Sequence, residues 1–192
     1  MKFCLGIAWA LLISGAVMAG PGNIAPAAIV TASTSLNKQL DASHVVDGVI
    51  GVDGKGEWAC EGVTTDWGYI RFPWIQLAWI TLQTINKIVL YDRASLQENI
   101  AGGRLEFSDG SKIWVNELPK NGIGKAIHFT DKTVSWVKFV ATDGTGSDLG
   151  FSEIEVFPSP VQANDYVSWV DPYIETNRGR YFFLLRVTGP LG

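Results

Sequence analysis

Hydrophobic and polar positions alternate with a period of two along much of the chain. Around residue 139, for example, Val137, Phe139 and Ala141 fall on one side of the pattern and Lys138 falls on the other. A period of two places successive side chains on opposite faces of an extended strand. This segment is therefore predicted to be a β-strand with one buried face and one polar face.

Segments rich in β-branched and aromatic residues recur between residues 24 and 158, with Gly, Asp, Asn, Ser or Pro between most of them. Asp109 and Gly110 lie between two such segments and are a strong hairpin signal. No helix-period segment of useful length separates the predicted strands. The pattern predicts an all-β fold, an antiparallel β-sandwich or jelly roll. The predicted strands span residues 29–33, 74–79, 85–91, 104–107, 112–115, 126–129, 136–141 and 153–157.

The first residues have the pattern of a secretory signal. Met1 and Lys2 form a positive start, residues 3–17 are almost wholly apolar, and Val17 and Ala19 place small residues before Gly20. This pattern predicts a signal peptide over residues 1–19 and an exported protein, periplasmic or extracellular. The alternative is a transmembrane anchor, but the apolar run is shorter than the roughly 20 residues that a bilayer needs. We therefore expect no membrane span after the signal is removed.

Composition and charge narrow the function. The chain has 192 residues, 47% of them hydrophobic, which is enough apolar material for one sizeable core. Its 15 basic and 19 acidic residues give a net charge of -4, and no Lys/Arg run stands out, so no nucleic-acid partner is expected.

Without the signal, Cys60 is the one remaining cysteine, which rules out an internal disulfide. We expect this thiol to be buried as a small hydrophobe.

The chain changes character after Pro158-Ser159-Pro160. Prolines on both sides of a serine predict a stiff linker over residues 159–164. Residues 165–192 are too few for a core of their own. They are expected to form a short irregular C-terminal extension.

Eight short motifs occur in order along the predicted sandwich. The series resembles the discoidin-like domains, also called coagulation factor 5/8 C-terminal-type domains, over about residues 24–157. This family includes many bacterial carbohydrate-binding modules. The motifs are Ile24-Ala25-Pro26, Val30-Thr31-Ala32-Ser33, Val46-Asp47-Gly48, Glu57-Trp58, Trp74-Ile75-Gln76-Leu77, Ile85-Asn86-Lys87-Ile88, Tyr91-Asp92-Arg93 and Gly150-Phe151-Ser152-Glu153-Ile154-Glu155-Val156.

The resemblance implies a galactose-binding-like jelly roll whose end loops hold a ligand and whose core commonly contains a structural calcium. One departure from the family is clear. Asp47-Gly48 is normally followed closely by Thr and Trp, but here a longer insertion intervenes and the Thr position is missing.

A second resemblance lies beyond the linker. The segment from Asp165 to Thr176 is similar to the opening of glycoside hydrolase family 92, the calcium-dependent exo-α-mannosidases. That resemblance implies a parent protein that is an α-mannosidase whose catalytic residues are not in this chain. The family's pattern is lost near Leu184, and a truncation or frameshift there would explain the loss. The alternative is a C-terminal tail that only looks similar.

Calcium prefers six to eight oxygen ligands, mostly carboxylates and carbonyls in a bent loop. The resemblance implies Asp47 and Glu153 as ligands, and the turn that contains Asp53 and Gly54 adds Asp53 on local chemistry alone. The alternative is an ordinary Asx-turn at Asp47 with a solvated Glu153.

Sugar binding needs aromatic faces for C–H groups and polar side chains for hydroxyls. Trp58, Trp67 and Tyr69 lie in or beside Gly-rich loops, and Arg93 and Asn99 follow them at the next loop. These five residues are the predicted ligand-binding set. For Trp58 and Trp67, packing is an equal alternative, and Arg93 could instead pair with Asp92 or Glu98. The other strand tryptophans, Trp74, Trp79, Trp114 and Trp136, are expected to pack in the core or on a sheet face.

No catalytic residue is predicted. Asp66, Asp92, Glu98 and Asp109 are available carboxylates, but nothing singles out a pair across a cleft. The two resemblances together imply a non-catalytic carbohydrate-binding module that holds a C-terminal glycosidase domain near glycans. The alternatives are a structural spacer that packs on that domain, or the N-terminal fragment of an active α-mannosidase.

Overall fold

The computed structural model describes residues 22–50, 54–60, 65–66, 69–70, 72–120 and 122–160, with backbone alone at 65–66 and 69–70. The chain divides into two units, Met1–Ser159 and Pro160–Gly192, and the fold below is that of the first. The predicted signal segment and the stretch from 165 to 192 lie outside the described residues, so both stay predictions.

The described residues form a β-rich fold with three short 3-10 helices, which confirms the all-β prediction. Asn37 and Asp41 begin two of these helices, because each side chain accepts backbone N–H groups of the following turn. The helices are η1 (Ala25–Ala27), η2 (Lys38–Leu40) and η3 (Ala42–Val46). The strands are β1 (Ile29–Ala32), β2 (Trp58–Ala59), β3 (Thr65–Asp66), β4 (Tyr69–Ile70), β5 (Trp74–Asp92), β6 (Asn99–Phe107), β7 (Lys112–Asn116), β8 (Lys125–Thr145) and β9 (Gly150–Pro158).

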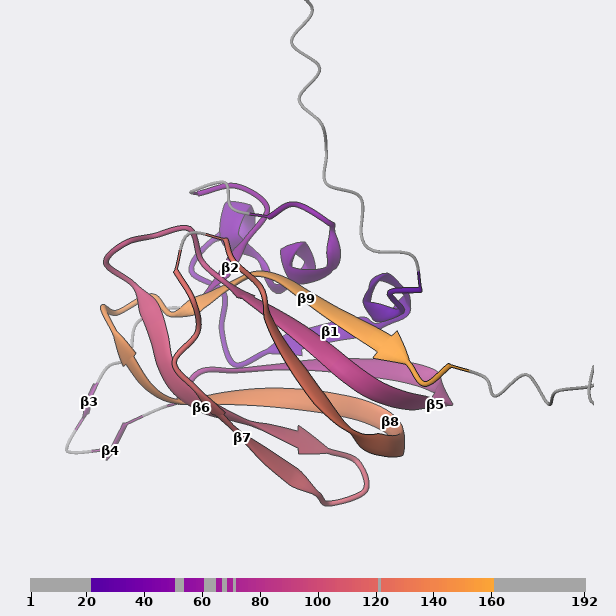
Figure 1. Ribbon diagram of the computed structural model, residues 1–192. Coiled ribbons are helices and arrows are strands. Elements are labelled where there is room, and N and C mark those ends of the chain that lie inside the picture. Colours follow the sequence, from indigo (N-terminus) through magenta and orange to yellow (C-terminus); the bar gives the residue numbers. More distant parts are fainter. Residues whose placement is uncertain are drawn as a thin grey trace, which may run out of the picture. The chain divides into compact units, whose positions relative to one another are not determined.

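Seven of the described strands form one antiparallel sheet in the order β2-β9-β5-β8-β6-β7, with β1 paired to β5, while β3 and β4 pair with each other. The strands β5 and β8 are long, at 19 and 21 residues. The first part of β5 pairs with β1 and the second part with β9, and both parts pair with β8. The two long strands thus run through both layers of an antiparallel β-sandwich, as Figure 1 shows.

The bend in the long strands corrects the predicted boundaries. The segments predicted at 74–79 and 85–91 are one strand, and so are those at 126–129 and 136–141. The register of β5 against β8 shifts between Ala78 and Gln83, where the chain turns without a break. Such an irregularity lets a strand change direction while its pairing continues. No Gly or Pro marks this bend in β5, so the sequence offered no turn residue there.

The core follows the predicted alternation on one strand and departs from it on another. Val137, Phe139 and Ala141 of β8 are buried between the layers, as predicted. In β9 the carboxylates Glu153 and Glu155 are buried together with the apolar residues between them, so the alternative of a solvated Glu153 is not observed. Gly48, just after η3, donates its N–H to Glu153, so the helical segment covers this side of β9.

Candidate functional site

A buried arginine joins three loops at one end of the sandwich. Arg93 directly follows β5 and is 5% exposed. Its Nη2 donates to Glu57 Oε1 at 2.9 Å, and its Nη1 donates to Glu98 and to the carbonyl oxygen of Asp148. The side chain therefore links the segment before β2, the β5–β6 loop and the β8–β9 loop.

Asp92, the residue before Arg93, holds the two ends of the β5–β6 loop through hydrogen bonds to the backbone. Its Oδ1 accepts the backbone N–H of Arg93 at 2.9 Å, and its Oδ2 accepts that of Ile100 at 3.0 Å. Burial raises the pKa of Asp92 to about 7, against the opposing effect of these two donors. Asp92 thus fixes the loop backbone and does not face an open cleft.

Asn99 ends the same loop and is buried too. Its Nδ2 donates to the carbonyl oxygen of Ser95 at 2.9 Å. Two predicted ligand-binding residues, Arg93 and Asn99, therefore lie in one cluster, but their contacts are internal. The predicted ion pair between Arg93 and Glu98 is observed. Asp92, the other predicted partner, accepts the backbone N–H of Arg93 instead.

Sequence reasoning missed Glu57 as a member of this cluster. The side chain is fully buried, and its Oε1 also accepts the N–H of Gly54 at 3.0 Å. Among the described residues, Glu57 Oε2, Arg93 Nε and Asn99 Oδ1 are buried atoms without a hydrogen-bond partner. The one available signal was the Glu57-Trp58 motif, which was assigned to Trp58 alone.

Trp58 lies in the core and is 2% exposed. Its ring stacks near Phe151 with centroids 6.2 Å apart, and its Nε1 donates to the carbonyl oxygen of Thr34 at 2.8 Å. The packing alternative is therefore observed, and no open ring face is left for a sugar. Trp67 lies outside the described residues, and Tyr69 is described only as backbone in β4.

Two of the predicted calcium residues, Asp47 and Glu153, lie near each other, because Gly48 directly contacts Glu153 of β9. Glu153 is 1% exposed, and its Oε2 accepts the N–H of Gly48 at 3.1 Å. Burial raises the pKa of Glu153 to about 8, and the negative charges of Asp47 and Glu155 act in the same direction. In the described part of the chain, Glu153 Oε1 is a buried carboxylate oxygen with no partner.

Asp47 is more exposed and makes local contacts. Its Oδ1 accepts the N–H of Val49 at 2.9 Å, which is an Asx-turn, and its Oδ2 lies 2.9 Å from His44 Nδ1. Asp53, the third predicted ligand, lies outside the described residues. A cation would offset the charge of the unpartnered oxygen of Glu153, but both carboxylate oxygens of Asp47 already have partners, so calcium binding stays a prediction. Within the described ranges no cluster of three or more His, Cys, Asp or Glu side chains is arranged for a metal.

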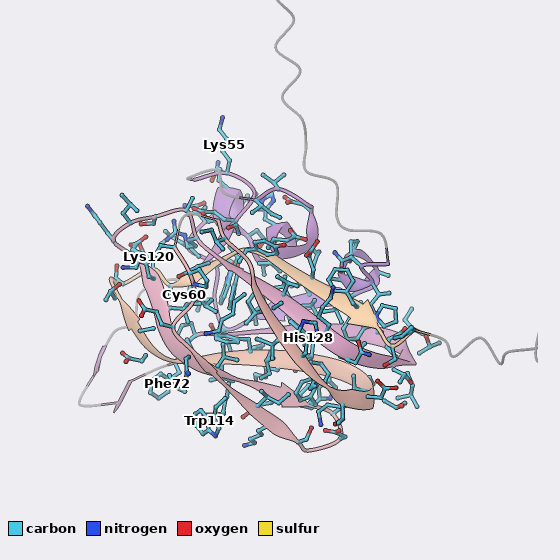
Figure 2. All side chains as sticks on the ribbon, viewed as in Figure 1. Lys55, Cys60, Phe72, Trp114, Lys120 and His128 are labelled. Atoms are coloured by element: carbon cyan, nitrogen blue, oxygen red, sulfur yellow. The ribbon has the colours of Figure 1, made fainter. Side chains whose placement is uncertain are left out.

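Two further predictions concern buried and exposed side chains. Cys60 is a buried free thiol, as predicted, and burial raises its pKa to about 11. Figure 2 shows Cys60 within the body of the sandwich. Trp79 packs in the core, whereas Trp114 is 70% exposed on β7.

Among the residues that the structure describes, no helix is long and apolar enough to cross a membrane.

Comparison with solved structures identifies the fold. A chitosan-binding module of a Paenibacillus sp. IK-5 chitosanase/glucanase matches with a TM-score of 0.56 and 22% identity, over 70% of this chain and 98% of the module. A family 32 carbohydrate-binding module from C. perfringens in complex with galactose matches with a TM-score of 0.54 and 19% identity, over 70% and 97%. A fucose binding module from Streptococcus pneumoniae matches with a TM-score of 0.57 and 16% identity, over 71% and 98%.

These likenesses confirm the galactose-binding-like β-sandwich. No curated protein matches the chain. The family match covers residues 23–157 and ends before the segment that resembles glycoside hydrolase family 92, so that resemblance stays a prediction. Because the match spans well over half of its residues, the chain belongs to the family described as domain of unknown function (DUF7402).

Proposed function

We propose that this domain is a non-catalytic carbohydrate-binding module. The observation that carries the proposal is the match to three solved modules over 97% to 98% of their own length. These are a chitosan-binding module, a family 32 module in complex with galactose and a fucose binding module. Fold alone does not determine a ligand, so the sugar contacts must come from this chain's own loops.

We assign ligand contact to the end of the sandwich where Arg93 links the segment before β2, the β5–β6 loop and the β8–β9 loop. We call this region the loop end. Because Trp58 is buried, Trp67 and Tyr69 remain the aromatic residues predicted to stack on a sugar ring. Arg93 acts as a positioning residue, since its guanidinium is occupied by Glu57 and Glu98. Asn99 plays the same part by holding Ser95.

A structural spacer is the second candidate, and a specific observation favours it. Three of the five predicted ligand-binding residues, Trp58, Arg93 and Asn99, are buried in internal contacts. A spacer needs no exposed aromatic residue in its loops and would pack on a neighbouring domain. The two candidates therefore differ in whether the loop end binds a soluble sugar at all.

Calcium, export and the parent enzyme are further parts of the proposal. Glu153 and Asp47 would hold a calcium ion, with Asp53 as a third ligand, and the ion would neutralise buried carboxylate charge. The sequence of residues 1–19 supports export. The similarity of Asp165 to Thr176 to family 92 supports a C-terminal α-mannosidase domain as the partner.

Isothermal titration calorimetry of the whole chain tests the binding function. The ligands are galactose, fucose, chitotriose, a galactan and a mannan, each with calcium and again with a chelator. We expect saturable binding of one neutral sugar, with loss of that binding in Trp67→Ala and Tyr69→Ala. Trp114→Ala, a tryptophan variant on β7, is the control and should bind as the wild type does. A flat response to every sugar, in a protein that unfolds cooperatively, would establish the spacer.

A further inference from the structure

The outer face of the sheet carries a row of side chains that the loop-end function does not use. Trp74 in β5 pairs with Val140 in β8, Val140 with Arg104 in β6, and Arg104 with Trp114 in β7. Residues paired across adjacent strands point to the same side of a sheet. Their neighbours along the strands, such as Phe139, are buried in the core, so this row lies on the other side of the sheet. Val140 is the one buried member of the row, at 8% exposure.

A second outward row lies two residues further along each strand. It consists of Gln76, Lys138, Glu106 and Lys112, again paired from β5 to β7. We call the eight residues of the two rows the tryptophan face. Strands lie about 4.8 Å apart, so the three steps from β5 to β7 span about 14 Å. The face is therefore long enough for more than one sugar ring.

The aromatic surface of this face is open. Trp114 is 70% exposed, and Figure 2 shows it projecting from the margin of the sandwich. Trp74 is partly exposed. Trp136 is partly exposed as well, but it pairs with Ala78, four residues further along β5. Trp and Arg are the residue types most enriched where proteins bind partners.

Cations lie against these rings. Lys138 Nζ is 4.0 Å from the ring centroid of Trp74, and Arg104 Cζ is 5.9 Å from that of Trp114. Glu106 accepts from Arg104 Nε at 2.7 Å and lies 3.3 Å from Lys112 Nζ. Three cations against one carboxylate leave an excess of two positive charges on this face, within a chain whose net charge is -4.

We propose that the tryptophan face binds an acidic polysaccharide. The sugar rings lie with their C–H faces on Trp114 and Trp74, and the carboxylates of the uronic acid units pair with Lys138 and Arg104. The opposite charges favour a polyanion over a neutral chain. The aromatic rings favour a sugar over an anion without an apolar face. None of these residues belongs to the Arg93 cluster, so the site is independent of the proposed loop-end function.

Affinity electrophoresis of the whole chain in gels that contain polygalacturonate tests this site. We expect retardation by polygalacturonate, and an affinity about tenfold lower for Trp114→Ala. Lys138→Gln should weaken binding as well, and added salt should weaken the wild type, because exposed charges are screened. A galactan gel, run in parallel, measures binding to a neutral chain.

Two control variants match these changes. Leu96→Ala alters an exposed apolar side chain in the β5–β6 loop, and Lys55→Gln removes an exposed charge before β2. Both should retain the polygalacturonate affinity of the wild type. Thermal unfolding of each variant separates loss of binding from loss of folding. Trp67→Ala should keep this affinity too, which distinguishes a failure here from a failure of the loop-end proposal.

Several outcomes would overturn the proposal. One is the absence of retardation by polygalacturonate. Another is a retardation by the galactan that Trp114→Ala weakens as much as the retardation by polygalacturonate, since the loop end can bind a neutral chain without Trp114. Equal affinity for a DNA oligonucleotide would show general polyanion binding. A wild-type dimer that Trp114→Ala disperses, measured by light scattering, would assign the face to a second copy of the chain.

Discussion

The loop end and the tryptophan face use the same residue types in opposite ways. At the loop end, Trp58 is 2% exposed and Arg93 is 5% exposed, and both are held by internal hydrogen bonds. On the tryptophan face, Trp114 is 70% exposed and Arg104 lies over its ring. The side chains that resemble a ligand site in the sequence are structural, and the exposed aromatic surface lies on a strand.

The difference comes from what covers each strand. Both residues of β2 are buried, because Trp58 packs on Phe151 and the turn from Asn37 onward lies over the same region. The strand β7 is at the edge of the sheet, and its outward positions have no covering layer. Proximity to a Gly-rich loop therefore says little about exposure, whereas strand phase and sheet position determine it.

The largest expected effect is a difference in stability between variants of the buried Trp58 and the exposed Trp114. Trp58→Ala should lower the free energy of unfolding by about 3–5 kcal/mol, because it removes a large buried side chain and leaves a cavity. Trp114→Ala should lower it by less than about 1 kcal/mol, since only a cross-strand contact is lost. Urea unfolding of both variants measures the difference. Equal costs would contradict the contrast in burial.

The two arginines give the next comparison. Arg93→Met should lower the free energy of unfolding by roughly 3 kcal/mol, because Glu57 would be left as a buried charge without its partner. Arg104→Met should cost at most about 1 kcal/mol, since Glu106 can still reach water and Lys112. Urea unfolding again provides the measurement. A small effect at Arg93 would contradict the importance of its buried ion pair with Glu57.

Two neighbouring glycines on β6 test which face of the strand is buried, because Gly103 faces the core and Gly102 the opposite side. A Cβ at Gly103 would lie 2.1 Å from the ring of Phe139, whereas at Gly102 the nearest atoms are 3.5 Å away. Gly103→Ala should therefore cost about 1–3 kcal/mol through overpacking. Gly102→Ala should change stability by less than about 1 kcal/mol. Thermal unfolding of the two variants measures this difference. An equal loss of stability would show that the outer face at Gly102 is packed as tightly as the core at Gly103.

Local pattern was enough to predict the sandwich. Alternation such as Val137, Phe139 and Ala141 identified the inward faces, and the series of motifs from Ile24 to Val156 identified the family of folds. The bend in β5 was not predictable, because it depends on the register with β8 and carries no turn residue. Local signals therefore predict strands well and their continuation through a bend poorly.

The site was harder to predict than the fold. The sequence placed Arg93 and Asn99 at one end of the sandwich, and the structure brings them together. It could not show that Glu57, which is 36 residues before Arg93, takes up the guanidinium. Likewise, nothing local distinguishes Trp114 from the core residue Trp79, since both lie on β-strands. Exposure depends on contacts between distant segments, and one sequence does not reveal them.

The last comparison concerns two carboxylates, Glu153 and Glu106, whose pKa values shift in opposite directions. Burial raises the pKa of Glu153 to about 8, with Asp47 and Glu155 adding negative charge. Without metal, the folded protein keeps this proton between about pH 4.5 and 8, whereas the unfolded chain has lost it. The free energy of unfolding should therefore fall as the pH rises through this window, by up to about 1.4 kcal/mol per pH unit.

Glu153→Gln should remove that slope in chelator, apart from the part that Asp92 contributes up to its own pKa of about 7. On the tryptophan face, hydrogen bonds from Arg104 and Lys112 lower the pKa of Glu106. Its stabilising contribution is present above the unfolded pKa and is lost as the pH falls through the folded value. Glu106→Gln should thus differ from the wild type in neutral solution and approach it in acid. Urea unfolding from pH 3 to 9 checks both variants. An unchanged slope in Glu153→Gln would contradict the raised pKa of Glu153 in the folded protein.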